Sequence, residues 1–259
     1  MPELPEVESA AAALRAAAVG RRIARAHLLH PALGRRLGAE QAARLEGRAI
    51  RDVVRRGKHQ LIALDDGATL VAHFRMTGDW VVGRIADPPE RFARAVLELD
   101  DGTRVTLDDP RALATLVLVP AGTDALPALG MEPLDAGFTP VALRAALARR
   151  RGPIKPVLLD QRVVAGLGNI YAAEALWLAR ISPRARAGTL SAARVARLVR
   201  AVRGVLRRAS AGRYWAGGGG ARWRVYDRAG RACPRCGAAI RRIVQAGRST
   251  YYCPRCQRR

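Results

Sequence analysis

The 259-residue sequence contains no apolar run long enough to span a membrane, and its acidic N-terminus lacks the apolar segment of a secretion signal. The first absence excludes a membrane-spanning helix. The second argues for a reducing compartment, in which disulfides are rare. We therefore expect a cytoplasmic protein with no membrane partner.

Acidic residues are scarce, since 22 Asp and Glu stand against 45 Lys and Arg, for a formal net charge of +23. An excess of this size implies a polyanionic partner, most simply nucleic acid, and binding that weakens with salt. The arginine bias of a GC-rich genome would explain the preference for Arg over Lys. It would not explain the excess of basic over acidic residues.

Lysine is almost absent, because Lys58 and Lys155 are the only two lysines among the 45 basic residues. An ammonium group can change its pKa and transfer protons, which a guanidinium does poorly. We expect a functional role for both lysines. Chance retention at the surface is the alternative.

Cysteine occurs only near the C-terminus, as Cys233-x2-Cys236 and Cys253-x2-Cys256. This spacing is typical of a tetrahedral site with four thiolates around one Zn²⁺. A disulfide pair is the alternative, and a reducing compartment argues against it. No catalytic His, Asp or Glu lies nearby, so the zinc is expected to be structural. Residues 240–245 and 249–252 predict a hairpin between the two cysteine pairs, with its turn at 246–248.

The chain opens Met-Pro-Glu-Leu-Pro-Glu-Val-Glu. If Met1 is removed, Pro2 has a free secondary amine with a pKa near about 8, which is partly neutral and nucleophilic in the cell. Its attack on a sugar carbon would give a cationic iminium, and Glu3 could move protons beside it. Pro5 and the acids after it predict a helix from Pro5 to about Val19. An ordinary acidic, proline-capped helix start is the alternative.

The first half of the sequence predicts a β-sandwich or barrel, because short alternating runs are separated by turns. The expected strands are Ile23–Leu29, Ile50–Arg55, Gln60–Leu64, Thr69–Met76, Ala93–Leu99, Arg104–Leu107 and Leu116–Val119. Lys58 falls in the turn Gly57-Lys58-His59 between two strands.

The second half has helical periodicity. We expect helices at 141–151, around 157–160, at 170–179 and at 191–208. Asn169 is placed to cap the third of these, and the preceding Gly166-Leu167-Gly168 turn would let its backbone approach a phosphate. A plain interhelical turn is the alternative. Four glycines, Gly217–Gly220, predict a mobile loop that is either a lid or a connector.

Four motifs follow one another over nearly the whole chain: the Pro-Glu-Leu-Pro-Glu-Val-Glu start, the Gly-Lys turn, Gly-Leu-Gly-Asn-Ile-Tyr at 166–171 and the Cys₄ hairpin. Together they resemble the formamidopyrimidine-DNA glycosylase / endonuclease VIII family. The resemblance implies an α+β multidomain fold with a β-sandwich and flanking helix at 1–119 and a linker at 120–140. A helix-two-turn-helix domain at 141–222 and a zinc finger at 223–259 would follow, with DNA between the lobes.

The resemblance also implies roles for individual residues. Pro2 would be the nucleophile that forms the Schiff base, and Glu3 would transfer protons at the sugar. Lys58 would act in β-elimination and Arg248 in δ-elimination, both also binding phosphate. Residues expected to bind DNA are Met76, Arg111, Leu113, Arg150, Lys155, Gly168 and Asn169, of which the first three fill the void left by the extruded base.

Three positions depart from the family pattern of purine-excising members. Leu113 replaces a Phe, Ala112 replaces an Arg, and Phe92 replaces a His that contacts DNA in many relatives. A leucine wedge is still apolar, so unstacking remains possible, but the aromatic stack is lost. These changes bear on which lesion is preferred, while the catalytic residues are intact.

The function implied is a bifunctional DNA glycosylase/AP lyase of base excision repair, a monomer in the bacterial cytoplasm at the nucleoid. Its substrate would be double-stranded DNA with a damaged base or abasic site. The Met76/Arg111 pair favours oxidised purines, namely formamidopyrimidine and 8-oxoguanine. One alternative is the same chemistry on oxidised pyrimidines. The other is a non-catalytic zinc-containing nucleic-acid-binding protein.

Overall fold

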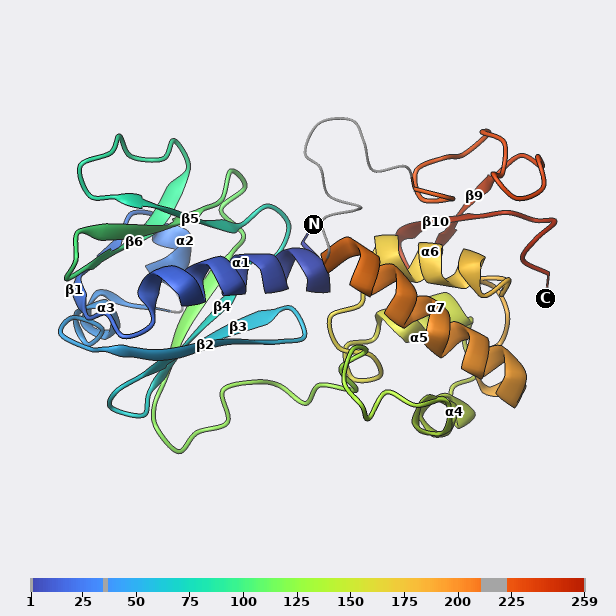
Figure 1. Cartoon of the computed structure of the whole chain (residues 1–259), viewed down its shortest axis with the longest axis horizontal. Coiled ribbons are helices and arrows are strands. Elements are labelled where there is room, and N and C mark those ends of the chain that lie inside the picture. The colour runs from blue at the N-terminus through green and yellow to red at the C-terminus, as the bar shows by residue number, and fades with distance from the viewer. Residues whose placement is uncertain (1, 35–36, 211–222, 259) are drawn as a thin grey trace. The chain divides into compact units, whose positions relative to one another are not determined.

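The computed structural model describes residues 2–34, 37–210 and 223–258 (Figure 1). The chain forms two compact units, one with Pro2 and Glu6–Pro127, the other with Glu3–Pro5 and the residues from Ala128 onward. Met1 and the Gly217–Gly220 loop lie outside the described residues. None of the described helices combines the length and apolar character that a membrane crossing requires.

The first unit is the expected β-sandwich, with two antiparallel sheets of four strands in the orders β1-β6-β7-β5 and β2-β3-β4-β8. The strands are β1 (Ile23–Leu28), β2 (Ile50–Arg56), β3 (His59–Leu64), β4 (Thr69–His73), β5 (Asp79–Arg84), β6 (Ala93–Leu99), β7 (Thr103–Asp108) and β8 (Thr115–Val119). Alternate residues of β3 are buried, as a strand with one face on a core requires. Across that core the Trp80 indole donates a hydrogen bond to Gln60 at 2.8 Å, joining the two sheets.

Helix α1 (Leu4–Ala18) agrees with the predicted helix to within one residue at each end. Its apolar residues Val7, Ala11 and Leu14 belong to the same buried cluster as the sandwich core. Figure 1 shows α1 lying along the sandwich. The α1 helix is therefore the flanking helix that the family resemblance implied.

Several elements of this unit were predicted wrongly or missed. Strand β5 was missed because only Trp80 among its six side chains is buried, which leaves no alternating pattern. β4 was predicted to reach Met76 but ends at His73, since Arg75 has a φ of 57° and leaves the extended conformation. The helices α2 (Pro31–Gly34) and α3 (Ala39–Ala43) are too short to show helical periodicity.

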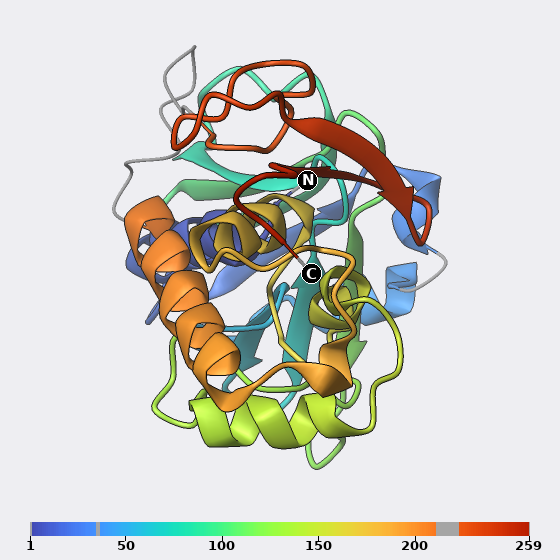
Figure 2. The same ribbon diagram turned by 90° about the vertical axis from the view of Figure 1, so that its right-hand side faces the viewer.

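The second unit contains the expected helices and zinc hairpin. Its elements are α4 (Pro140–Ala148), α5 (Ile154–Leu159), α6 (Asn169–Leu178), the 3₁₀ helix η1 (Ala187–Thr189), α7 (Ala192–Ser210), β9 (Arg241–Gln245) and β10 (Arg248–Tyr252). α6 lies between α7 and the hairpin (Figure 2), and its residues Tyr171–Trp177 are all buried. A helix surrounded in this way is mostly apolar, and Glu174 is the one charged residue of α6.

The hairpin turn differs from the prediction by one residue. Ala246 and Gly247 form a two-residue turn with φ of 47° and 72°, both in the left-handed region that such hairpins need. Arg248 is the first residue of β10 and pairs with Gln245. It is therefore held on the strand and not within the turn.

Candidate functional site

The carboxylate of Glu3 lies at the N-terminus of α6. Its Oε1 accepts a hydrogen bond from the Ile170 N–H at 2.8 Å and its Oε2 accepts one from the Tyr171 N–H at 3.3 Å. The next residue, Leu4, donates its N–H to the Gly166 carbonyl at 3.1 Å. Glu3 is only 1% exposed. The first N–H groups of a helix have no partner within it and favour an ionised carboxylate, so Glu3 and Leu4 are held on the glycine turn.

Gly168 makes room for this carboxylate. A Cβ at position 168 would lie 2.3–2.6 Å from the side-chain atoms of Glu3. Gly166 in the same turn has a φ of 78°, which L-residues with side chains rarely adopt. Both glycines of the predicted phosphate-binding turn are therefore required by the structure, one for space and one for its backbone conformation.

Asn169 does not cap α6 as predicted. Gly168 is the N-cap and has no side chain to offer, so Glu3 supplies the cap from the far end of the sequence. The Asn169 side chain points elsewhere. Its Nδ2 donates to the Ser249 carbonyl at 3.0 Å, and its Oδ1 accepts from Lys155 Nζ at 2.5 Å.

Lys155 is buried at the centre of this cluster, with 1% of its surface exposed. Its ammonium donates to Asn169, to the Ser249 carbonyl at 3.1 Å and to Thr250 Oγ1 at 2.7 Å. Burial, together with the positive charge of Arg248, lowers the pKa of Lys155 to about 8, although the negative charge of Glu3 acts in the opposite direction. Lys155 thus ties α5, α6 and β10 together.

The second unit therefore brings Glu3, Lys155, Gly168 and Asn169 into one cluster at the start of β10. Arg248, exposed, immediately precedes Ser249 in that strand. Among the described residues, no hydrogen bond or ion pair joins Arg150 to this cluster. It follows α4, and its guanidinium lies 3.3 Å from the Asp160 carboxylate.

In the first unit, Lys58 lies on the two-residue turn between β2 and β3, as expected, and is half-buried. Gly57 in this turn has a φ of 60°. The guanidinium of Arg55 donates to the Gly57 carbonyl at 3.0 Å and to the Glu8 carboxylate of α1 at 2.7 Å. One side chain thus joins the Lys58 turn to the helix that Pro2 precedes.

The three residues expected to fill the void occur on two neighbouring loops. Met76 and Leu113 are apolar yet 38% and 42% exposed, and Arg111 is also exposed. The loops are held together by Asp109, which is fully buried and accepts a short hydrogen bond from Thr77, the residue after Met76.

Asp109 also shapes its own loop. Its Oδ1 accepts from the Arg111 N–H at 3.2 Å, and its Oδ2 accepts from the N–H groups of Leu113 and Ala114 at 2.6 and 2.7 Å. Burial raises the pKa of the Asp109 carboxyl, but the bonds from Thr77 and these N–H groups outweigh it, so the pKa is below its usual value. The ionised carboxylate therefore positions Arg111 and Leu113.

Phe92 lies beside this loop, since its carbonyl accepts from the Asp109 N–H at 3.0 Å. The guanidinium groups of Arg91 and Arg94 lie 5.1 and 6.0 Å from its ring centre. Arg94 also donates to the Asp109 carbonyl at 2.7 Å. Cations over an aromatic face are attracted by its ring electrons. The departure from histidine at position 92 is thus accommodated by two arginines.

The buried carboxylates of Asp109 and Glu174 were not singled out from the sequence. Glu174, 0% exposed, accepts hydrogen bonds from the N–H groups of Arg224, Val225 and Tyr226 at 2.9–3.0 Å. The sequence could have indicated Glu174, because it is the only charged residue in the apolar helix α6. A buried charge needs hydrogen-bond partners, and with no basic residue in the same helix the backbone can supply them.

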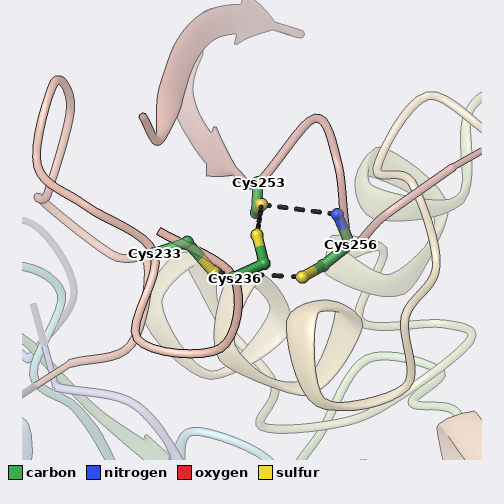
Figure 3. Close-up of side chains that lie close together, drawn as sticks. All are labelled: Cys233, Cys236, Cys253 and Cys256. Carbon is green, nitrogen blue, oxygen red and sulfur yellow. Dashed lines mark hydrogen bonds between the residues drawn. The ribbon is translucent and has the colours of Figure 1, made fainter. Parts of the chain in front are cut away.

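The four cysteines form a closed site (Figure 3). Their Sγ atoms lie within 4.8 Å of one another, with Cys236–Cys253 at 3.5 Å and Cys233–Cys256 at 4.0 Å. Tetrahedral Zn–S bonds of about 2.3 Å place sulfurs about 3.8 Å apart, so the site fits one Zn²⁺. The Trp177 indole donates to Cys233 Sγ at 3.4 Å, an outer hydrogen bond typical of metal-bound thiolates. The zinc is structural, because four thiolates leave no open position.

Comparison with known proteins gives matches along the whole chain. Residues 1–116 match the model of the formamidopyrimidine-DNA glycosylase N-terminal domain, 129–214 that of its H2TH domain, and 230–259 that of a zinc finger found in FPG and IleRS. A formamidopyrimidine-DNA glycosylase of Chloroflexus aggregans is 45% identical, with 99% of this chain and 98% of the relative covered.

Solved structures agree with these matches. The MutM (Fpg) protein of Thermus thermophilus is 39% identical, with a TM-score of 0.86 over 99% of this chain and 98% of that one. A MutM bound to DNA containing carbocyclic 8-oxo-G is 32% identical, with a TM-score of 0.90 over the full length of both chains.

Proposed function

The chain belongs to the formamidopyrimidine-DNA glycosylase family, DNA glycosylases of base excision repair with AP lyase activity, and we propose that it excises oxidised purines through a Schiff base on Pro2. The preferred lesions are formamidopyrimidine and 8-oxoguanine in double-stranded DNA. The related MutM solved with 8-oxo-G DNA supports the purine preference. The non-catalytic alternative is set aside, because the relatives are named as enzymes over nearly their whole length.

In the proposed reaction the Pro2 amine attacks C1′ of the damaged nucleoside, and the bond from C1′ to the base breaks. Ring opening leaves an iminium between C1′ and the Pro2 nitrogen. This cation acidifies the C2′–H bond, so a base removes that proton and the 3′ phosphate leaves by β-elimination. Removal of the C4′ proton then expels the 5′ phosphate by δ-elimination. Lys58 assists the first elimination and Arg248 the second, each also binding phosphate.

The observation that carries this proposal is the fixed position of Glu3. Its buried carboxylate is held by two N–H groups of α6, and Pro2 is its neighbour in the chain. Hydrogen bonds of this kind favour the charged form of a carboxylate. An ionised Glu3 stabilises the iminium and accepts a proton at the sugar.

The same proposal assigns DNA contacts to the remaining predicted residues. Lys155, Gly168 and Asn169 grip the backbone beside the lesion, and Arg150 binds it further along. The exposed side chains of Met76, Arg111 and Leu113 fill the void left by the extruded base, with Arg111 bonding the estranged partner.

We also propose the domain limits 1–119, 120–140, 141–222 and 223–259, and a monomer that works at the nucleoid in the bacterial cytoplasm. The bacterial origin of the relatives and the DNA substrate support this location.

The test is borohydride trapping on DNA with an abasic site, using protein whose processed Pro2 terminus has been verified. We expect a covalent adduct that peptide mass spectrometry locates on residue 2. The competing primary amines are few, because Lys58 and Lys155 are the only lysines. An adduct on either lysine, with residue 2 unmodified, would overturn the proposal.

Two variants sharpen this test. Pro2→Gly should trap more weakly, and protein that retains Met1 should trap almost nothing, since its amine is displaced by one residue. Pro5→Gly is the matched control and should keep most of the trapping yield. For lesion preference, single-turnover excision should be faster on duplexes with an oxidised purine than with an oxidised pyrimidine, and the reverse order would favour the pyrimidine alternative.

A further inference from the structure

A second basic site lies in the helical and zinc-binding unit, apart from Glu3 and Lys155. It is a cavity of about 420 Å³ lined by Arg180, Arg235, Cys236, Arg255, Cys256 and Arg258, with no acidic residue among them. Arg180 lies just beyond the C-terminal end of α6, whereas Glu3 contacts its N-terminal end. Ten helical residues rise about 15 Å, so the two sites are separate.

The four arginines of this cavity have no ion-pair partner among the described residues. Arg235 is held in place, because its guanidinium lies 3.9 Å over the Trp177 ring and donates to the Trp177 carbonyl at 3.1 Å. Arg194 adds a further guanidinium close by, donating to the Arg258 carbonyl at 3.4 Å. The cavity therefore concentrates positive charge around at least one fixed side chain.

The zinc centre accounts for part of this charge. Four thiolates around one Zn²⁺ carry a formal charge of about −2, and two of them, Cys236 and Cys256, line the cavity. Two guanidinium groups would balance that charge, so about two of the four positive charges in the cavity stay unbalanced. Charge compensation of the zinc centre alone therefore does not account for four arginines.

We propose that this cavity binds a phosphate group, held by Arg180, Arg235, Arg255 and Arg258. Guanidinium groups bind phosphate oxygens through paired N–H bonds, and several of them around one concavity select a multiply charged anion. The volume is within the range of small-ligand sites, so it accommodates a phosphate with its attached group. The phosphate comes either from the DNA backbone away from the lesion or from a small phosphate compound.

The variant that tests this is the triple change Arg180→Gln, Arg255→Gln and Arg258→Gln. Arg235 is left in place because its stacking on Trp177 makes it part of the fold. The matched control is the triple change Arg144→Gln, Arg200→Gln and Arg207→Gln, which removes the same charge from exposed positions on α4 and α7. Zinc content and thermal unfolding establish that both proteins are folded and loaded.

The first measurement is titration calorimetry of the zinc-loaded proteins with pyrophosphate. Wild type and control should bind with similar affinity, and the cavity variant at least about tenfold more weakly, since three charge-assisted contacts are lost. A second readout places the ligand. Pyrophosphate should slow zinc loss to N-ethylmaleimide, a neutral thiol reagent, in wild type and control but not in the cavity variant, because Cys236 and Cys256 line the site.

Two duplexes carrying one abasic-site analogue distinguish the sources of phosphate, one of about 12 and one of about 40 base pairs. If the DNA backbone enters the cavity, the cavity variant loses affinity for the long duplex relative to the control but not for the short one. If a small compound is the ligand, the variant and control bind both duplexes alike. Borohydride trapping on the short duplex should stay at the control level in either case. Failure of the phosphate-site proposal can therefore be told apart from failure of the proposed Schiff-base chemistry on Pro2.

The proposal is overturned if the cavity variant matches the control in three measurements: its affinity for pyrophosphate, the slowing of zinc loss by pyrophosphate, and its affinity for the long duplex. It is also overturned if the cavity variant loses zinc faster than the control while its anion binding is unchanged. That result would mean that the arginines serve only the thiolate charge.

Discussion

Gly168 has no side chain, yet it decides where Glu3 can lie. A Cβ there would be 2.3–2.6 Å from Glu3 atoms, and no side-chain contact that short is tolerated. We expect Gly168→Ala to push the carboxylate off the Ile170 and Tyr171 N–H groups. The predicted cost is about 2–4 kcal/mol in the free energy of unfolding, from strain together with lost charge-assisted bonds.

Urea unfolding and single-turnover borohydride trapping measure this effect, and trapping should slow at least about tenfold. Gly152→Ala is the control, because its Cβ would meet nothing closer than 4.0 Å. It should remain within about 0.5 kcal/mol of wild type. Normal trapping by a folded Gly168→Ala protein would contradict the role given to Glu3.

The residue that caps α6 could not be predicted from the residues next to the helix. Local capping rules select Asn169 because it is the nearest polar side chain before the helix. The real cap, Glu3, is 167 residues from Ile170 in the sequence, and only the fold brings them together. By contrast, Lys155 could be singled out from composition alone, because a rare lysine in an arginine-rich chain has a distinct chemistry.

At the scale of elements, the loop after β7 depends on Asp109. The Asp109→Asn variant would turn an amide NH₂ toward the Thr77 hydroxyl or toward the N–H groups of Leu113 and Ala114, leaving at least one buried donor unpaired. We expect a loss of about 2–3 kcal/mol in the free energy of unfolding. Weaker binding to duplex DNA should accompany it, since Arg111 and Leu113 lose their support.

The sign of its pH dependence follows from the lowered pKa of Asp109. A carboxyl whose pKa is lower in the folded state contributes its full stability above its unfolded pKa and loses it as the pH falls through the folded value. The difference in the free energy of unfolding between wild type and Asp109→Asn should therefore be constant at neutral pH and shrink only in acid. Asp124→Asn, at an exposed aspartate, is the control and should show no such gap. An equal gap for both variants would exclude the proposed support.

Whether a helix or strand could be predicted from the sequence depended on how regularly its buried side chains are spaced. α7 was predictable because six apolar residues at helical spacing are all buried on one face. β5 was not, because its valines at 81 and 82 are both exposed at a sheet edge and its one buried side chain, Trp80, gives no period. The turns at Gly67 and Gly102 agree with residue chemistry, because each follows an Asp and Asp-Gly pairs favour hairpin turns, and both glycines have positive φ.

At the scale of the whole chain, the described residues contain three separate buried apolar clusters. The cluster around the zinc site is the smallest, with Ala173, Trp177, Val225, Cys233, Ile240 and Cys253. A core of this size cannot stabilise a fold alone, so the metal must supply much of the folding free energy there. The sandwich and the helices have much larger cores of their own.

Zinc removal should therefore loosen one part of the protein and leave the rest folded. After chelation, we expect amide hydrogen exchange to rise across residues 232–258, because the hairpin loses its metal anchor. It should also rise at the start of α6, since Lys155 and Asn169 lose Ser249 and Thr250 as partners. Amides of β6 and β7 should keep their protection, because their core contains no residue of the zinc module.

Readdition of metal provides the control for this experiment. Zn²⁺ should restore protection in both places, whereas Mg²⁺ should restore neither, because thiolates are soft ligands and Mg²⁺ prefers oxygen. DNA binding should fall and recover together with protection at α6. If exchange at the hairpin rose while α6 and DNA binding stayed unchanged, the contacts between Lys155 and β10 would not couple the zinc module to the cluster around Glu3.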